Sequence, residues 1–197
     1  MSEQELTFRP LITENTTFKP VRQIYSGFEI EKRYLLLTPD EDTSKKKNGQ
    51  QIYNEVLESG TPIEQGYVKD IQVAKEVLDN LGIELDFKPN TIRVRKYGKD
   101  YILTVKDRKE LKKREVEWEL SKKQFQDIWA LTKGARVTKK RLIKKIKGHT
   151  VEIDAFTDRF LLIAEIEVTD ESQLEGLPKL GMDITGNKAF SNKALSK

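Results

Sequence analysis

The chain contains no cysteine among its 197 residues, which excludes a disulfide framework, a thiolate nucleophile and a zinc site with cysteine ligands. Its single histidine, His149, follows Gly148, where we expect a turn residue rather than a lone metal ligand. No apolar run approaches the ~20 residues of a membrane-spanning helix, and the first residues lack the basic start and apolar centre of a signal peptide. These absences predict a soluble, cytoplasmic protein that does not bind a membrane.

Charged residues are abundant but nearly balanced in sign. Lys and Arg number 36 against 32 Asp and Glu, so the net charge is +4 in a chain that is 35% charged and 37% hydrophobic. This composition is that of a polar globular protein of one moderate domain. Because the net charge is small, a pI near 9.0 does not by itself indicate nucleic acid, and we do not expect nucleic acid as a partner.

The most informative segment is residues 28–37, which reads as a strand with charge on one face. With the two-residue period of a strand, Glu29, Glu31 and Arg33 share one face, while Ile30 and Tyr34 lie on the other. Paired carboxylates are ligands for a hard cation such as Mg2+, and an adjacent fixed cation suits a phosphate. A solvated strand face has the same pattern, so repetition on other strands decides between the two.

Other segments repeat this alternation. Strands are expected at residues 63–69, 91–97, 101–106, 112–120, 137–146, 151–156 and 161–169. Amphipathic helices are expected at residues 50–59, 70–81 and 122–133, a loop at 38–49, and a short helical tail at 187–195. Residues 1–27 show no clear period and are interpreted as an N-terminal arm, which places a single domain at 28–197.

The charged faces sort by sign from strand to strand. Acids mark the strands of Glu29, Glu115, Asp154 and Glu165, and bases mark those of Arg93, Lys106 and Lys139. A solvated face would mix the two signs, because like charges on neighbouring strands destabilise each other. If about eight antiparallel strands close into a barrel, the charged set points inward and the apolar set faces outward beneath the helices. The predicted fold class is therefore α+β, mainly β: a closed eight-stranded antiparallel barrel forming a tunnel with a charged lumen that holds water, metal ions and a polyanion.

These residues resemble the E-x-E-x-K signature and further motifs of the CYTH, or triphosphate tunnel metalloenzyme, superfamily. The similar segments are Glu29–Arg33, Gln65–Tyr67, Arg93–Arg95, Leu103–Lys106, Arg114–Glu117, Lys139–Arg141, Asp154–Phe156, Glu165–Glu167 and Asn192–Leu195. They cover residues 28–196 in the family's order. The resemblance implies an eight-stranded tunnel that binds triphosphates with a divalent metal, as in inorganic and thiamine triphosphatases, a class of adenylate cyclases, and fungal and viral RNA triphosphatases.

The resemblance also implies roles for individual residues. It suggests Glu29, Glu31, Glu165 and Glu167 as ligands of the main Mg2+ or Mn2+ ion, and Glu115, Glu117 and Asp154 for a second ion. Phosphate oxygens would be held by Arg93, Arg95, Lys106, Lys139 and Arg141, with Lys188 closing one end. The predicted catalytic group is Arg33, Tyr67 and Glu31. For each residue the alternative is an ion pair that only supports the barrel.

One departure from the signature concerns the mechanism. Where the signature ends in lysine the chain has Arg33, and Lys32 lies on the opposite face of the strand. In phosphatase members that lysine, with the tyrosine matching Tyr67, is thought to help activate the attacking water. Arginine stays protonated at any working pH, so we predict that a carboxylate or metal-bound water acts as the base and that Arg33 contributes only electrostatics.

Three classes of function follow from these patterns. The preferred one is metal-dependent hydrolysis of a linear triphosphate. Inorganic tripolyphosphate is preferred as the substrate over a nucleoside or thiamine triphosphate, because no motif indicates a site that recognises a nucleobase or a thiazole ring. The alternatives are an adenylate cyclase of class IV type, which would convert ATP to cyclic AMP and pyrophosphate, and a polyphosphate- or nucleotide-binding module without turnover. A small-molecule triphosphate is the expected partner, and a homodimer is compatible with the sequence.

Overall fold

The computed structural model describes residues 21–36, 43–109 and 112–197 of the chain. In this part of the chain the strands are β1 (Arg22–Leu35), β2 (Thr61–Tyr67), β3 (Thr91–Tyr97), β4 (Asp100–Lys109), β5 (Lys112–Glu119), β6 (Arg136–Ile146), β7 (His149–Phe156), β8 (Leu162–Val168) and β9 (Met182–Asp183). The helices are α1 (Thr43–Ser59), α2 (Ile71–Asn80), α3 (Lys122–Ala130) and α4 (Asn192–Leu195), with 3-10 turns η1 (Glu171–Leu174) and η2 (Lys188–Phe190). The predicted mainly β, α+β class is confirmed.

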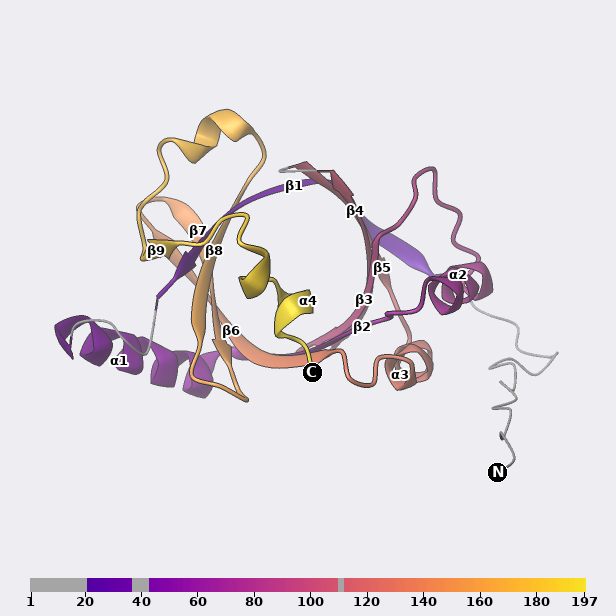
Figure 1. Cartoon of the computed structure of the whole chain (residues 1–197), viewed down its shortest axis with the longest axis horizontal. Helices are drawn as coiled ribbons and strands as arrows, with labels where there is room; N and C mark the ends of the chain where they lie inside the picture. Colours follow the sequence, from indigo (N-terminus) through magenta and orange to yellow (C-terminus); the bar gives the residue numbers. More distant parts are fainter. Residues whose placement is uncertain (1–20, 37–42, 110–111) are drawn as a thin grey trace, which may run out of the picture.

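All strand pairings are antiparallel, and β1 is shared between two neighbours. Residues 22–29 of β1 pair with β5, and residues 30–35 pair with β8. The hydrogen-bonded order β5-β4-β3-β2-β6-β7-β8-β1 therefore returns to β5, and Figure 1 shows these strands arranged as a ring. The predicted count of eight strands is wrong by one for the described chain, because the two-residue strand β9 also pairs with β1.

Tight turns join successive strands of the sheet. Gly98, with φ of +59°, turns β3 into β4, and Lys147 and Gly148, with φ of +50° and +84°, turn β6 into β7. Glycine adopts a positive φ at little energetic cost, so Gly98 and Gly148 suit these two turns. His149 itself is not in the turn, contrary to the prediction: it begins β7 opposite Ile146.

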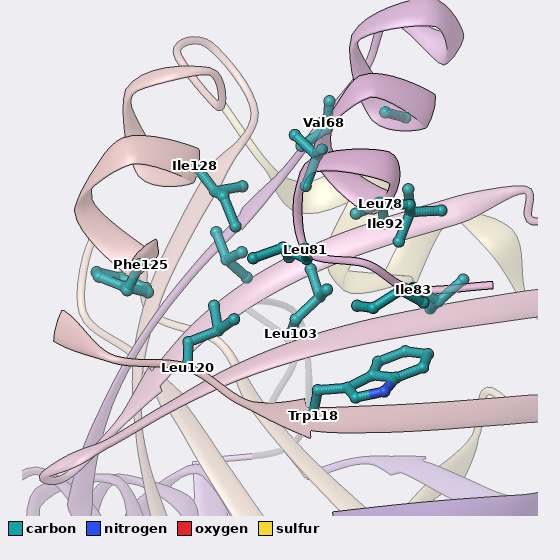
Figure 2. Packing of buried hydrophobic residues seen from close by; sticks show 14 of the residues in the cluster. Val68, Leu78, Leu81, Ile83, Ile92, Leu103, Trp118, Leu120, Phe125 and Ile128 are labelled. Atoms are coloured by element: carbon teal, nitrogen blue, oxygen red, sulfur yellow. The ribbon is translucent and has the colours of Figure 1, made fainter. Parts of the chain in front are cut away.

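The hydrophobic core lies between the outer face of the ring and the helices. One cluster joins α2 and α3 to β3, β4 and β5 through buried residues such as Leu78, Phe125, Leu103 and Trp118, which Figure 2 shows pointing toward one another. A second cluster packs α1 against β7 and β8. The apolar faces in these two clusters therefore point outward beneath the helices, as the alternation predicted. A third buried cluster, which includes Phe156 and Ile163, lies on the opposite face and packs against the C-terminal part of the chain.

The helices begin close to where the sequence indicates, with one exception. The Asp70 carboxylate accepts hydrogen bonds from the backbone N–H groups of Gln72 and Val73, and Ser121 forms a reciprocal capping box with Gln124. The exception is α1, which begins at Thr43, so residues 43–49 are helical and not the loop that was predicted. None of the helices in the described ranges is long and apolar enough to cross a membrane.

The predicted boundary between the N-terminal arm and the domain falls inside a strand. β1 begins at Arg22, whereas the sequence placed the start of the domain at Phe28. Residues 22–27, which the sequence analysis assigned to the arm, therefore form the first part of β1. The remainder of the predicted arm, residues 1–20, lies outside the described residues.

Candidate active site

A cavity of about 650 Å³ lies on the polar side of the strands. In the described chain, seven basic and seven acidic side chains line it. The basic residues are Arg33, Arg93, Arg95, Lys106, Lys139, Arg141 and Lys193. The acidic residues are Glu31, Asp107, Glu115, Glu117, Glu152, Glu165 and Glu167. A cavity lined by so many charges of both signs suits a polyanion accompanied by cations.

The two signs occupy different arcs of the ring. Five of the basic side chains come from β4, β3 and β6. Strand β2, which lies between β3 and β6, contributes the uncharged Gln65 and Tyr67. The adjacent strands β7, β8, β1 and β5 carry six of the acidic ones. Arg33 on β1 and Asp107 on β4 are the exceptions among the strand residues that line the cavity. The sorting by sign that the sequence predicts is thus preserved in space as a basic wall and an acidic wall.

At the first seam between the walls, β3 and β4 meet β5 through a buried network. Lys106 Nζ lies 2.5 Å from a Glu115 carboxylate oxygen, and Arg95 Nη2 lies 3.1 Å from Glu117 Oε1. The buried Thr104 hydroxyl donates to Glu117 Oε1 at 2.7 Å and accepts from Arg93 Nη2 at 3.0 Å. Glu115 and Glu117, which the resemblance suggested as metal ligands, therefore fix the basic side chains in place.

Arg95 has unused hydrogen-bonding capacity within this network. Its Nε is buried and has no hydrogen-bond partner among the described residues. Burial and the neighbouring charge of Arg93 lower the pKa of Arg95, although Glu117 opposes them. A buried guanidinium that is short of acceptors is a natural contact for an anion such as a phosphate.

At the second seam, β6 meets β7 around the fully buried Asp154. Arg141 donates to both Asp154 oxygens at 2.7 Å, and Lys139 Nζ contacts the same carboxylate. Burial lowers the pKa of Lys139 even though Asp154 opposes the shift. Burial also disfavours the charge on Arg141, but attraction to Asp154 outweighs it and raises the pKa of Arg141 well above its usual value. Asp154 does not line the cavity, so it acts here as the counterion of two basic residues.

Arg33 links the acidic wall to the C-terminal part of the chain. Its Nε donates to Glu165 Oε1 at 2.8 Å, and its Nη2 donates to the backbone carbonyl of Phe190 at 3.2 Å. Burial disfavours its charge, but Glu165 and Glu31 outweigh burial and raise the pKa of Arg33. Burial would likewise raise the pKa of Glu165, but Lys139, Arg33 and Arg141 lower it below the ordinary range. A guanidinium with a raised pKa cannot accept a proton from water.

Tyr67 is on β2, between the basic residues of β3 and those of β6. Its hydroxyl accepts a hydrogen bond from Gln65 Nε2 at 2.8 Å, and both side chains are buried and line the cavity. Burial raises the pKa of Tyr67, although Arg93 and Lys106 act in the opposite direction. Tyr67 is therefore protonated at neutral pH and can donate a hydrogen bond.

The acidic wall offers hard oxygen ligands but no complete metal cage. Glu31 on β1 lies directly opposite Glu167 on β8, and both line the cavity. Like charges directly opposite each other are destabilising, and a divalent cation between them would remove the repulsion. No group of three acidic or histidine side chains among the described residues has the geometry of a metal site. The carboxylates of Glu31 and Glu167 are nevertheless oxygen ligands of the type that hard divalent cations bind, which makes this pair the candidate metal ligands.

The remaining predicted metal ligands are not brought together. Glu165 pairs with Arg33 and Arg141, and Asp154 pairs with Lys139 and Arg141. Glu115 and Glu117 line the cavity, whereas Asp154, the third ligand suggested for a second ion, does not line it. The side chain of Glu29 is outside what the structure describes.

Sequence reasoning missed some residues of the cavity and misplaced another. Glu152 lines the cavity beside Arg141 and was given no role, although it shares a strand face with Asp154. Burial raises the pKa of Glu152, while Arg141 opposes the shift. Lys193 and Asn192 line one end of the cavity, whereas the predicted Lys188 is exposed and does not. The alternation of β7 could have indicated Glu152, but no periodic pattern distinguishes Lys193 from Lys188.

The chain is similar in sequence and structure to inorganic triphosphatases. An inorganic triphosphatase of Nitrosomonas europaea is 32% identical over 111 residues, which cover 53% of this chain and 74% of the relative. The crystal structure of an inorganic triphosphatase matches with a TM-score of 0.50 at 25% identity, covering 85% of this chain and 93% of that one. No family model matches the sequence.

The fold and the cavity thus define an antiparallel β protein with a charged cavity, and its fold is similar to that of an inorganic triphosphatase. The chain belongs to the CYTH, or triphosphate tunnel metalloenzyme, superfamily.

Proposed function

We propose that this protein is a metal-dependent enzyme that hydrolyses a linear triphosphate, with inorganic tripolyphosphate as its substrate. The observation that carries the proposal is the cavity in which a basic wall faces an acidic wall. The basic wall can hold phosphate oxygens, and the acidic wall can hold the cation that accompanies them. The sequence similarity to an inorganic triphosphatase, which covers 74% of that relative, supports the same substrate class.

The balance of charge in the cavity supports a requirement for a metal ion. Seven basic side chains are matched by seven acidic ones in the described chain, so the lining has no surplus positive charge to neutralise a triphosphate. Mg2+ or Mn2+ held by Glu31 and Glu167 would supply that charge and would offset the negative charge that develops as the phosphoanhydride bond breaks.

The basic wall positions the substrate. Arg93, Arg95 and Lys106 are held in a network with β5 and face the cavity, so we assign them the first phosphate contacts. Arg141 and Lys139 are oriented by Asp154 and complete the wall from the other side. Fixed cations of this kind need no reorganisation when the substrate binds, which is how electrostatic preorganisation lowers a barrier.

The reaction is attack of water on the terminal phosphorus. The bond between that phosphorus and its bridging oxygen breaks, orthophosphate forms, and pyrophosphate leaves. Arg33 and Tyr67 both have raised pKa values and remain protonated, so neither accepts the proton of the attacking water. We assign that proton to a carboxylate of the acidic wall, with Glu31 as the candidate because it lines the cavity beside the proposed cation.

The ring of paired strands is, in this proposal, the triphosphate tunnel, and the catalytic domain extends from β1 to residue 197. A small-molecule triphosphate is its partner, and the absence of cysteine is compatible with the cytoplasm.

A phosphate-release assay tests the proposal. Tripolyphosphate, ATP, GTP and thiamine triphosphate are each incubated with the protein and Mg2+ or Mn2+, with EDTA as the metal-free control. We expect release of one phosphate per tripolyphosphate with either ion and none with EDTA. Chromatography of the ATP products separates ADP and phosphate from cyclic AMP and pyrophosphate. Binding of every triphosphate without release under both ions would reject the enzyme in favour of a binding module.

A further inference from the structure

Tyr25 is an aromatic residue of the cavity lining that the proposed reaction does not use. It lies on β1, in the part of the chain that the sequence analysis assigned to the N-terminal arm. In the β1–β5 pairing Tyr25 lies opposite Glu117, which also lines the cavity. Residues directly opposite each other in an antiparallel pair have side chains on the same face of the sheet. The Tyr25 side chain therefore belongs to the inner face of the strand ring.

Two other aromatic residues, Tyr67 and Phe28, line the cavity in the described ranges. Tyr67 is buried within the wall. Phe28 lies opposite Arg114 in the β1–β5 pairing, and the Arg114 guanidinium contacts Asp86, which does not line the cavity. The Phe28 side chain therefore belongs to the outer face of the sheet. Tyr25, which is 42% exposed, is the residue that offers an accessible aromatic ring on the inner face.

Gly27 provides the place in which the phenol ring of Tyr25 lies. A Cβ at Gly27 would be 2.6 Å from Tyr25 Oη and 3.0 Å from Cζ, so the phenol ring covers the glycine on the inner face of β1. The Tyr25 hydroxyl donates to the backbone carbonyl of Phe28 at 3.5 Å. These contacts hold the phenol ring along the wall of the cavity. An aromatic ring that is held in this way can stack on another planar group.

Tyr25 lies at the end of the cavity away from η2 and α4. Arg33, on the same strand, donates to the backbone carbonyl of Phe190 in η2. At ~3.3 Å per residue, the part of β1 from Arg33 to Tyr25 is roughly 26 Å long. Glu117, opposite Tyr25, lies 3.1 Å from Arg95 Nη2. Tyr25 is therefore close to a residue with a proposed phosphate contact, on the side that leads out of the cavity.

We propose that Tyr25 is a stacking platform for the base of a nucleoside triphosphate whose phosphates contact Arg93 and Arg95. This role rests on the proposed triphosphatase function and adds nucleoside triphosphates to tripolyphosphate as its substrates. A ribose separates the base from the phosphates, so the base lies beyond them, toward Tyr25. Stacking uses the π-face that every base has, so it needs no hydrogen-bonding motif for a nucleobase. A purine presents a larger π-face than a pyrimidine and should be preferred.

Three triphosphate esters test whether an aromatic substituent contributes. The value of kcat/KM for phosphate release with Mg2+ is compared among ATP, UTP and methyl triphosphate. We expect ATP to exceed methyl triphosphate about tenfold, through a lower KM at similar kcat, because stacking stabilises bound substrate and transition state alike. UTP should lie between the two. Equal values for all three esters would overturn this role of Tyr25.

Calorimetry with the same esters separates this role from the proposed function. If no triphosphate releases phosphate but ATP binds about tenfold more tightly than methyl triphosphate, the proposed function fails and the stacking platform stands. If no phosphate is released and the esters bind equally, both fail. Release of phosphate from tripolyphosphate, with no preference among the esters, overturns the stacking platform alone.

Variants of Tyr25 assign the preference to its phenol ring. Tyr25→Ala should reduce the preference for ATP over methyl triphosphate about tenfold, whereas Tyr25→Phe keeps the aromatic ring and should stay within about twofold of the unmodified protein. The matched control is Ile24→Ala, at a neighbouring residue that is 43% exposed and does not line the cavity; it should keep the full preference. A preference that survives Tyr25→Ala would refute the platform. Equal loss in Tyr25→Phe and Tyr25→Ala would assign the preference to the hydroxyl and would refute stacking.

Discussion

Replacing Asp154 by asparagine should strongly destabilise the protein, because its carboxylate is the counterion of two buried basic residues. Asp154 is 1% exposed, accepts two hydrogen bonds from Arg141 at 2.7 Å and contacts Lys139. Asparagine keeps the shape but removes the charge, which leaves Lys139 without its counterion and leaves Arg141 with Glu152 and Glu165. Breaking a buried ion pair from one side costs about 3–5 kcal/mol, which corresponds to a fall in Tm of roughly 10 °C for a chain of this size.

Urea and thermal unfolding in metal-free buffer at pH 7 measure this effect. The matched control is Asp127→Asn, which removes an exposed pair with Lys123 at 2.9 Å and should cost less than about 0.5 kcal/mol. If the two variants lost similar stability, the structural role of Asp154 would be refuted. A variant of normal stability with weakened Mg2+ or Mn2+ binding would instead restore Asp154 as a metal ligand.

Three further predictions concern other parts of the structure. Arg33→Lys should add an alkaline limb to the pH–rate profile, because lysine can lose its proton in the working range; an unchanged rate and profile would contradict the electrostatic role of Arg33. The hydrogen bond from Lys32 lowers the pKa of Asp183 to about 2, so this contribution to stability should be complete above about pH 4 and fade as the pH falls toward 2. Carboxyl NMR titration measures that pKa, and Lys32→Met should return it toward its ordinary value. Gly66→Ala should cost about 1–3 kcal/mol in urea unfolding, because the new Cβ would lie 2.4 Å from Thr132 Oγ1; the cost should shrink in a Thr132→Ala background, and strict additivity would exclude the contact.

The alternation of charged and apolar residues predicted which face of each strand points inward. In β5, Glu115 and Glu117 line the cavity, while Val116 and Trp118 are buried in the core outside the ring. Successive side chains of a strand point to opposite faces, so the alternation in the sequence is sufficient to assign each residue to a face. Helix bounds were predictable where a capping residue marks the start, as Asp70 and Ser121 do, and failed at α1, where lysine-rich residues 43–49 lack an apolar stripe.

The pairing of charges across strands could not be read from the sequence. Asp154 was expected to bind metal, but the register places it opposite Arg141 on β6. Such a pairing depends on how distant strands are shifted against each other, and one-dimensional patterns do not contain that shift. The position of Lys193 at the cavity, in place of Lys188, likewise follows from how η2 and α4 turn over the end of the ring.

The shared strand β1 also has a consequence for how the protein acquires its structure. Its partners β5 and β8 begin at residues 112 and 162, so every hydrogen bond that β1 makes to them joins points far apart along the chain. Contacts of large sequence separation form slowly, because the entropy of a long loop is lost before any contact compensates for it. During synthesis β1 leaves the ribosome before the other strands, yet it obtains its last neighbour only after β9 has emerged. Completion of the sheet is therefore expected to be the slow step of folding, with the hairpins β3–β4 and β6–β7 formed well before it.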